Sequence, residues 1–141
     1  MSTVIAAIDQ GTTSTRCMLF DRQGRTQSLA QREHHQTFPH PGWVQHDADE
    51  IWRHVRRLVP EALDQARVGV RDVAALGIAN QRETTVVWDR TTGHSLGPAI
   101  TWQDTRTADI VAELVARGED ERIVDITGLP PHTYFAGPRL R

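Results

Sequence analysis

The alternation of apolar and polar stretches predicts three strands at the start of the chain. Val4–Ile8 is an apolar run typical of a buried strand, and Arg16–Phe20 predicts its partner. The sequence DRQG at residues 21–24 predicts a turn, because Gly24 supplies a permissive backbone position. Residues 26–36 then continue as a more polar strand. These three segments together predict an antiparallel meander.

A helical pattern follows the loop at residues 37–47. Asp47 with Glu50 three residues later resembles a capping box, which is a signature of a helix start. Apolar residues then recur at helical spacing, namely Ile51, Val55, Leu58, Ala62 and Ala66. Pro60 lies inside this pattern and should kink or split the helix, because proline removes one intrahelical hydrogen bond.

The second half of the chain mixes strand and helix patterns. Expected strands cover Val73–Ala79, TTVVWD at residues 84–89, and Ala99–Trp102. Thr105–Arg117 predicts an amphipathic helix that Gly118 stops, and a short helix ending at Gly128 follows. Antiparallel strands followed by a helix and a parallel strand predict an α/β fold whose sheet is mixed.

Composition excludes several classes of function. A length of 141 residues suits one domain with a real core, and a net charge of −2 gives no field that favours nucleic acid or a membrane surface. Cys17 is the single cysteine, which rules out an internal disulfide and a multi-cysteine metal site and fits a reducing compartment such as the cytoplasm. The first apolar run is cut at Asp9, which is unlike a signal peptide, and no run approaches the roughly 20 apolar residues that span a bilayer.

The basic residues are all arginine. The chain has sixteen arginines and no lysine, for which a coding bias is the plainest explanation. A Walker-type phosphate loop needs its lysine, so the sequence excludes that route to nucleotide binding. Lysine Schiff-base chemistry is excluded for the same reason.

A polar cluster, DQGTTSTR at residues 9–16, lies between the first two apolar runs. Gly11 allows close approach of the backbone to a ligand, and a tight turn here would aim successive N–H groups at an anion. Asp9 could hold Mg²⁺ through water, and Arg16 could offset the charge of a phosphoryl group. Hydroxyl donors for phosphate oxygens come from Thr12, Thr13, Ser14 and Thr15. The alternative is an ordinary polar hairpin tip, with threonines present for their strand propensity.

A second polar cluster, NQRETT at residues 80–85, follows the expected strand Val73–Ala79. Ligands of α/β sheets bind beyond the carboxyl ends of strands. Arg82 donates hydrogen bonds and an ionised Glu83 accepts them, so together they suit a small polyol, whose hydroxyls do both. The alternative is a solvated turn with an exposed ion pair worth about 1 kcal/mol at most.

Histidines and tryptophans give weaker signals. The irregularly spaced histidines indicate loop and strand-edge positions rather than a metal site: His34, His35, His40 and His46. Trp52 and Trp88 fall on an expected helix and strand and should belong to the core. Trp102 and Tyr134 could line a pocket or simply pack.

Five blocks in this order resemble the glycerol kinases, the polyol branch of the carbohydrate kinases that share the actin-like ATPase fold. The blocks are AIDQGTTSTR, PGWVQHDADEIW, GIANQRETTVVWD, AITWQDTRT and TGLPPHTYF, and the resemblance runs from about Val4 to Phe135. It implies an α/β, ribonuclease H-like domain with a mixed five-stranded sheet flanked by helices. It also implies phosphorylation of glycerol by ATP, with Mg²⁺, to sn-glycerol 3-phosphate.

The resemblance assigns roles to particular residues. Thr12, Thr13, Ser14 and Arg16 would contact the phosphates of ATP, and Asp9 would help to place Mg²⁺. Arg82, Glu83, Trp102 and Tyr134 would form the glycerol site. The sequence AGPRLR after Phe135 departs from the small-Thr-Lys sequence usual in relatives, although Pro138 is compatible with the first turn of a helix.

Family members are several-fold longer, which leads us to expect residues 1–141 to be an N-terminal kinase domain without its C-terminal partner. The catalytic aspartate and the adenosine pocket are then expected beyond Arg141, and the full enzyme is expected to be a homo-oligomer without nucleic-acid or membrane partners. Two alternatives stay open. The chain could be a catalytically incomplete module that binds a polyol or a partner, or part of a kinase for another polyol or a sugar.

Overall fold

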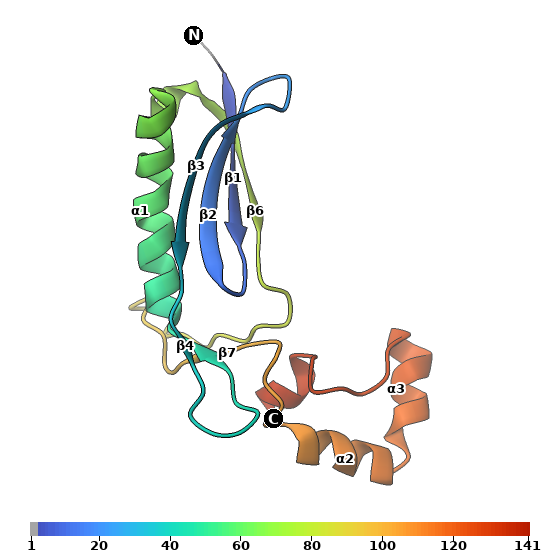
Figure 1. Cartoon of the computed structure of the whole chain (residues 1–141). Coiled ribbons are helices and arrows are strands. Elements are labelled where there is room, and N and C mark those ends of the chain that lie inside the picture. The colour runs from blue at the N-terminus through green and yellow to red at the C-terminus, as the bar shows by residue number, and fades with distance from the viewer. Residues whose placement is uncertain (1–2) are drawn as a thin grey trace. The chain divides into compact units, whose positions relative to one another are not determined.

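The computed structural model describes residues 3–141, which form two compact units (Figure 1). The first unit comprises residues 3–35 and 47–81, and the second comprises residues 36–46 and 82–141. Each unit therefore combines segments that are distant in the sequence.

A four-stranded sheet forms the centre of the first unit. Its strands are β1 (Val4–Gln10), β2 (Ser14–Phe20), β3 (Thr26–Glu33) and β6 (Val73–Ala79), in the order β3-β2-β1-β6. The first three strands are the expected antiparallel meander, and β6 pairs with β1 in parallel. The mixed α/β architecture is thus confirmed, but the expected count of five strands in this sheet is wrong.

Helix α1 (Ala48–Ala66) begins where the sequence predicted and runs without a break through Pro60. Asp47 caps it by accepting a hydrogen bond from the Asp49 amide at 2.8 Å. Glu50 does not complete the reciprocal half of a capping box, because its carboxylate accepts from the His35 amide instead. The predicted kink at Pro60 is wrong, since this residue is exposed to solvent and Leu58 and Ala62 on either side of it are held in the core.

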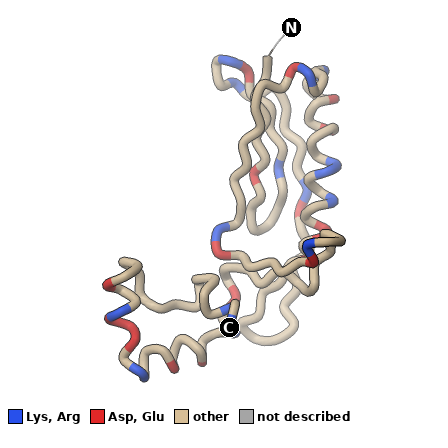
Figure 2. The backbone as a smooth tube through the Cα atoms, turned by 180° about the vertical axis from the view of Figure 1, so that it is seen from behind, with Lys and Arg blue, Asp and Glu red and all other residues tan. Residues whose placement is uncertain are grey.

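One face of the sheet packs against α1, which lies along β3 and β2 (Figure 1). The core between them contains Val4, Ala6, Cys17, Leu19, Ala30, Leu58, Ala62 and Leu63. Full burial of each large aliphatic side chain here stabilises the unit by roughly 1.5–3 kcal/mol. Trp52 is 59% exposed on α1, so its expected place in the core is wrong. Charges of both signs are mixed along α1 (Figure 2).

The second unit is built from short elements. They are β4 (Gln36–Thr37), β5 (Gln45–His46), β7 (Ala99–Ile100), α2 (Ala108–Ala116), α3 (Glu119–Thr127) and the 3₁₀ turn η2 (Gly137–Leu140). The three strands form an antiparallel sheet in the order β4-β5-β7. A second 3₁₀ turn, η1 (Val70–Asp72), belongs to the first unit and leads into β6.

Residues 84–89 do not form the expected strand. They make only isolated bridges, between Thr85 and Ile100 and between Trp88 and Ser95. The first bridge is to β7 and the second lies within a turn of the same segment, so the two do not make a continuous strand. Trp88 is exposed accordingly, and its expected place in the core is also wrong.

The two C-terminal helices end where glycine permits a left-handed backbone. Gly118 has φ of +71° between α2 and α3, and Gly128 has φ of +73° after α3. Both boundaries agree with the prediction. None of the helices found in residues 3–141 has the length and apolarity needed to cross a membrane.

Candidate functional site

The cluster at residues 9–16 forms a tight turn between β1 and β2. The Gly11 amide donates to the Ser14 carbonyl at 3.0 Å, and a Cβ at position 11 would lie 3.2 Å from that same oxygen. The His34 amide donates to the Thr13 carbonyl at 2.9 Å. Thr13 is exposed at the tip, Thr12 is half-buried, and Ser14 and Thr15 are buried. Backbone hydrogen bonds within the turn and from His34 therefore hold the turn, while Thr13 at its tip faces solvent.

Asp9 and Arg16 face each other across the hairpin. They are direct partners in the β1–β2 register, and Arg16 Nη1 lies 3.1 Å from Asp9 Oδ2. Arg16 Nε also donates to Gln31 Oε1, while Gln31 Nε2 donates to the Ser14 hydroxyl. Both charged side chains are more than 40% exposed, so this pair contributes about 1 kcal/mol at most to stability. It leaves both groups accessible to a ligand.

A hydrogen-bonded network supports the turn from the α1 side of the sheet. Thr15 Oγ1 donates to Gln10 Oε1 at 2.7 Å, and Gln10 Nε2 lies 3.2 Å from the Gly11 carbonyl and 2.9 Å from His34 Nε2. The Gln10 amide nitrogen can donate to His34 Nε2 when the ring is neutral and carries its proton on Nδ1. Burial lowers the pKa of His34, and the nearby His54 ring lowers it further.

The start of the second polar cluster also contacts this turn. Gln81 Nε2 donates to the Gly11 carbonyl at 2.9 Å, although the two residues are 70 positions apart. Gln10, His34 and Gln81 were not predicted from the sequence to support this turn. The contact of Gln81 depends on the parallel pairing of β6 with β1, and that of His34 on the antiparallel pairing of β3 with β2.

In the second unit, Glu83 is fixed at both its backbone and its carboxylate. It has φ of +64°, a left-handed conformation that is uncommon for a residue with a side chain. Its Oε2 accepts a hydrogen bond from the Ala136 amide at 2.7 Å, and its carbonyl accepts from Arg139 Nη1. Arg82, beside it, is exposed.

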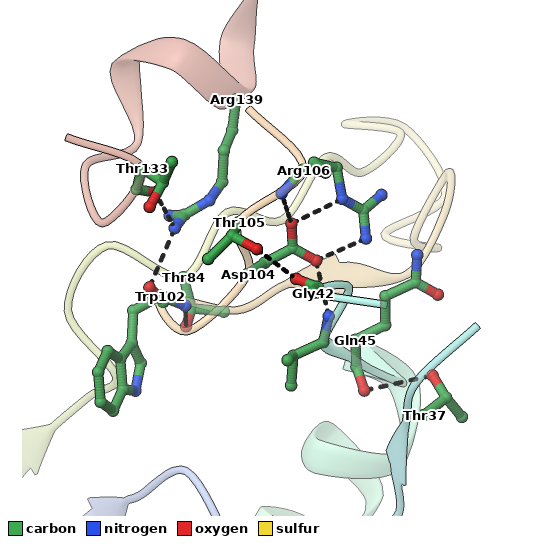
Figure 3. A network of polar contacts seen from close by, with 11 residues as sticks. Thr37, Gly42, Gln45, Thr84, Trp102, Asp104, Thr105, Arg106, Thr133 and Arg139 are labelled. Carbon is green, nitrogen blue, oxygen red and sulfur yellow. Dashed lines mark hydrogen bonds and ion pairs between the residues drawn. The ribbon is translucent and has the colours of Figure 1, made fainter. Parts of the chain in front are cut away.

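Trp102 and Tyr134 meet edge to face, with ring centroids 5.9 Å apart and an interplanar angle of 68°. Phe135 packs against Tyr134 in the same way at 5.1 Å. Through these contacts and those of Glu83, the second unit brings together the segments that carry three of the predicted polyol residues. No sequence motif points to Arg139, which donates to the backbone carbonyls of Glu83, Trp102 and Thr133. Figure 3 shows the bonds to Trp102 and Thr133.

Asp104 organises the segment that follows Trp102. Its side chain is fully buried and accepts from the Val44 amide at 2.7 Å and from Arg106 Nη2 at 2.8 Å (Figure 3). Burial raises the pKa of Asp104, but hydrogen bonds from Arg106 and from the Arg106 and Val44 amides outweigh it, so the net pKa is lowered. The Arg106 guanidinium stacks over Trp43, 3.8 Å from the ring centroid. The Asp104 bond to Val44 and the Arg106 contact with Trp43 therefore join the segment after β7 to the loop before β5.

A neighbouring contact closes the same loop. Gly42 has φ of +79°, and the Thr105 hydroxyl donates to its carbonyl at 3.1 Å (Figure 3). A Cβ at position 42 would clash with Thr105 Oγ1, and the left-handed backbone also favours glycine here. Among residues 3–141, no cluster of three or more His, Cys, Asp and Glu side chains is arranged to hold a metal ion. Asp9 is the carboxylate next to the turn between β1 and β2.

Comparison with known proteins agrees with this geometry. Residues 4–141 match the N-terminal domain of the FGGY family of carbohydrate kinases. The whole chain is 55% identical to the glycerol kinase of Nocardia farcinica and 54% identical to that of Saccharopolyspora erythraea, covering 28% of each. The structure of Plasmodium falciparum glycerol kinase with ADP aligns over 99% of this chain and 28% of its own, with 33% identity and a TM-score of 0.90.

Sugar kinases of the same family align as well. Xylulose kinase from Rhodospirillum rubrum covers 86% of this chain and 25% of its own length, with 29% identity and a TM-score of 0.77. The resemblance to glycerol kinases and the actin-like ATPase fold are therefore confirmed, and the chain spans just over a quarter of the length of these relatives. The chain belongs to the FGGY family of carbohydrate kinases.

Proposed function

We propose that this chain supplies the phosphate loop and most of the polyol site of a kinase that transfers the γ-phosphoryl group of ATP to glycerol. A glycerol hydroxyl oxygen forms the new bond to phosphorus, the bond from phosphorus to the bridging oxygen breaks, and ADP leaves. Identity of 51–55% to several glycerol kinases over the whole chain supports this choice of substrate within the family.

The observation that carries the proposal is the convergence of three segments in the second unit. Glu83 is fixed next to Tyr134 and Phe135 through the Ala136 amide, and Tyr134 contacts Trp102. We propose that Glu83 accepts hydrogen bonds from glycerol hydroxyls and that the exposed Arg82 donates to them. The two aromatic rings would cover the carbon chain. Three carbons with three hydroxyls fit a site that offers both donors and acceptors beside aromatic faces.

The first unit would hold the phosphates. Thr12, Thr13 and Ser14 lie at the turn, and Arg16 would offset the charge of the transferring group. Ser14 is buried, and its hydroxyl accepts a hydrogen bond from Gln31 Nε2, which leaves its own O–H free to donate to a phosphate oxygen. Thr13 is the exposed hydroxyl of the set, and we expect it to be the main side-chain donor to phosphate.

The residues at this turn also fit Mg²⁺. Asp9 is a half-exposed carboxylate next to the turn, and magnesium in phosphoryl-transfer sites is commonly bound by one or two carboxylates, through water, together with phosphate oxygens. When bound, the ion would neutralise charge on the phosphate oxygens. Asp9 would hold its water shell, and Arg16 would turn from Asp9 toward the phosphates.

The proposal assigns no catalytic base to residues 3–141. Relatives are several times longer, and we leave the aspartate base and the adenosine pocket to the part of such a protein that this chain does not cover. A cytoplasmic location, a homo-oligomeric enzyme and independence from nucleic acid stay predictions.

The substrate is tested with protein expressed from its complete gene. ADP formation from MgATP is measured with glycerol, xylulose and gluconate as acceptors in parallel. We expect glycerol to give the highest kcat/KM by at least about 100-fold, since a site built for one set of hydroxyls discriminates strongly against others. A preference for xylulose or gluconate would favour the sugar-kinase alternative. Calorimetric binding of glycerol without any turnover would favour the polyol-binding module.

A further inference from the structure

We infer that Arg139 is a positioning residue that assembles the polyol site, holding the segments of Glu83, Trp102 and Tyr134 together through a single guanidinium group. The inference rests on the proposed function, because it assigns a role within the same site. Arg139 was not among the residues that the sequence singled out.

The hydrogen bonds of Arg139 reach three separate parts of the chain, and Figure 3 shows those to Thr133 and Trp102. Nη1 donates to the Glu83 carbonyl, and Nη2 donates to the Thr133 carbonyl at 2.6 Å and to the Trp102 carbonyl at 3.2 Å. Each acceptor belongs to a residue of the polyol site or to its immediate neighbour. All three acceptors are backbone atoms, so Arg139 fixes the course of the chain and leaves the site's side chains available to a ligand.

The contact with Glu83 matters most. This residue has φ of +64°, which L-residues adopt only when their surroundings impose it. Arg139 holds the carbonyl of Glu83, while the Ala136 amide, three residues before Arg139, holds the carboxylate. The segment 136–139 therefore fixes both the strained backbone and the direction of the side chain that would accept from glycerol.

The positive charge of Arg139 lies near the carboxylates of Asp104 and Glu83. Burial lowers the pKa of Arg139, while the nearby carboxylates of Asp104 and Glu83 raise it. A guanidinium stays protonated in proteins, so the group is a permanent cation whose two terminal nitrogens donate in fixed directions. Lysine offers one nitrogen and cannot reproduce this fork. A neutral side chain at position 139 would also leave Arg106 as the one positive charge beside the buried Asp104.

The test compares R139M and R139K with the wild type, in protein expressed from its complete gene. The KM for glycerol, the KM for ATP and the melting temperature are measured for each variant. We expect R139M to raise the glycerol KM by at least about 10-fold while the ATP KM stays within about 2-fold, because the phosphate loop lies in the other unit. R139K should fall between R139M and wild type, since it keeps the charge without the fork.

A matched control is R122M on α3, where the arginine is 74% exposed and pairs only with Glu119 among the described residues. It should leave both KM values unchanged. Equal rises in both KM values for R139M would mean that Arg139 only supports the fold, and an unchanged glycerol KM would overturn the inference outright. If R139M does not fold, the test uses R139K. A raised glycerol KM with an unchanged ATP KM for R139K supports the inference, and two unchanged KM values overturn it. Absence of glycerol-dependent turnover in the wild type would instead overturn the proposed function.

Discussion

Replacement of Glu83 by alanine tests the polyol site at the residue with the best-defined geometry. The carboxylate accepts from the Ala136 amide at 2.7 Å, and we propose that it also accepts from a glycerol hydroxyl. Hydrogen bonds to charged groups are worth roughly 1.5–3 kcal/mol each. Loss of the hydrogen bond to glycerol should therefore raise the glycerol KM by about 10- to 150-fold. Loss of the hydrogen bond from the Ala136 amide should lower the free energy of unfolding by the same roughly 1.5–3 kcal/mol.

Glu83→Gln separates these two effects. Glutamine keeps an oxygen that can accept from the Ala136 amide but carries no charge, so its glycerol KM should lie between those of the wild type and Glu83→Ala. The assay couples ADP release to an optical readout. Glycerol is first varied at saturating ATP, and ATP is then varied at saturating glycerol. Glu121→Ala, at an exposed site on α3, is the control. A glycerol KM for Glu83→Ala within about twofold of wild type would refute the assignment of Glu83.

Three further predictions address the first unit. Thr13→Val should lower kcat/KM for ATP by about 10-fold through loss of one phosphate donor, and an unchanged value in ATP titrations would contradict the phosphate-loop assignment. Leu58→Ala removes a side chain that is 0% exposed and should cost about 2–5 kcal/mol in urea unfolding, whereas the exposed Trp52→Ala should cost far less. Burial lowers the pKa of His34, so the stability it confers is present above its unfolded pKa of about 6.5 and is lost as pH falls below that value. Urea midpoints at pH 7.5 and 5.5 should show this loss, and His34→Asn should reduce the difference between them.

Local sequence patterns correctly predicted those helices and strands that are marked by an apolar run, a capping residue or a terminal glycine. The apolar runs of β1 and β2, the Asp47 cap of α1 and the glycine that ends α3 all lie where expected. The same reasoning failed at Pro60, where packing of one helix face on the sheet outweighs the loss of a hydrogen bond on the exposed face. It failed again at Trp88, because strand propensity does not by itself make a strand, and residues 84–89 form two isolated bridges rather than a continuous ladder.

In the candidate site, too, residues marked by local motifs were predicted and residues that depend on distant contacts were not. Asp9, Thr13 and Glu83 were proposed from short motifs, because chemistry that needs adjacent residues leaves a local pattern, and their roles stay predictions. The contacts of Arg139 with Glu83 and of Gln81 with Gly11 were not found, because each joins residues more than 50 positions apart in the sequence. Such contacts exist only after the chain has folded, and a single sequence holds no record of them.

The most direct test of the central claim is transfer of the γ-phosphoryl group to glycerol. Protein expressed from its complete gene is incubated with MgATP and glycerol, and the products are followed by ³¹P nuclear magnetic resonance. The account predicts that a glycerol monophosphate signal grows in step with ADP and that the signal is lost when glycerol is omitted. ATP hydrolysis to free phosphate with no glycerol phosphate, or no loss of ATP at all, would contradict it.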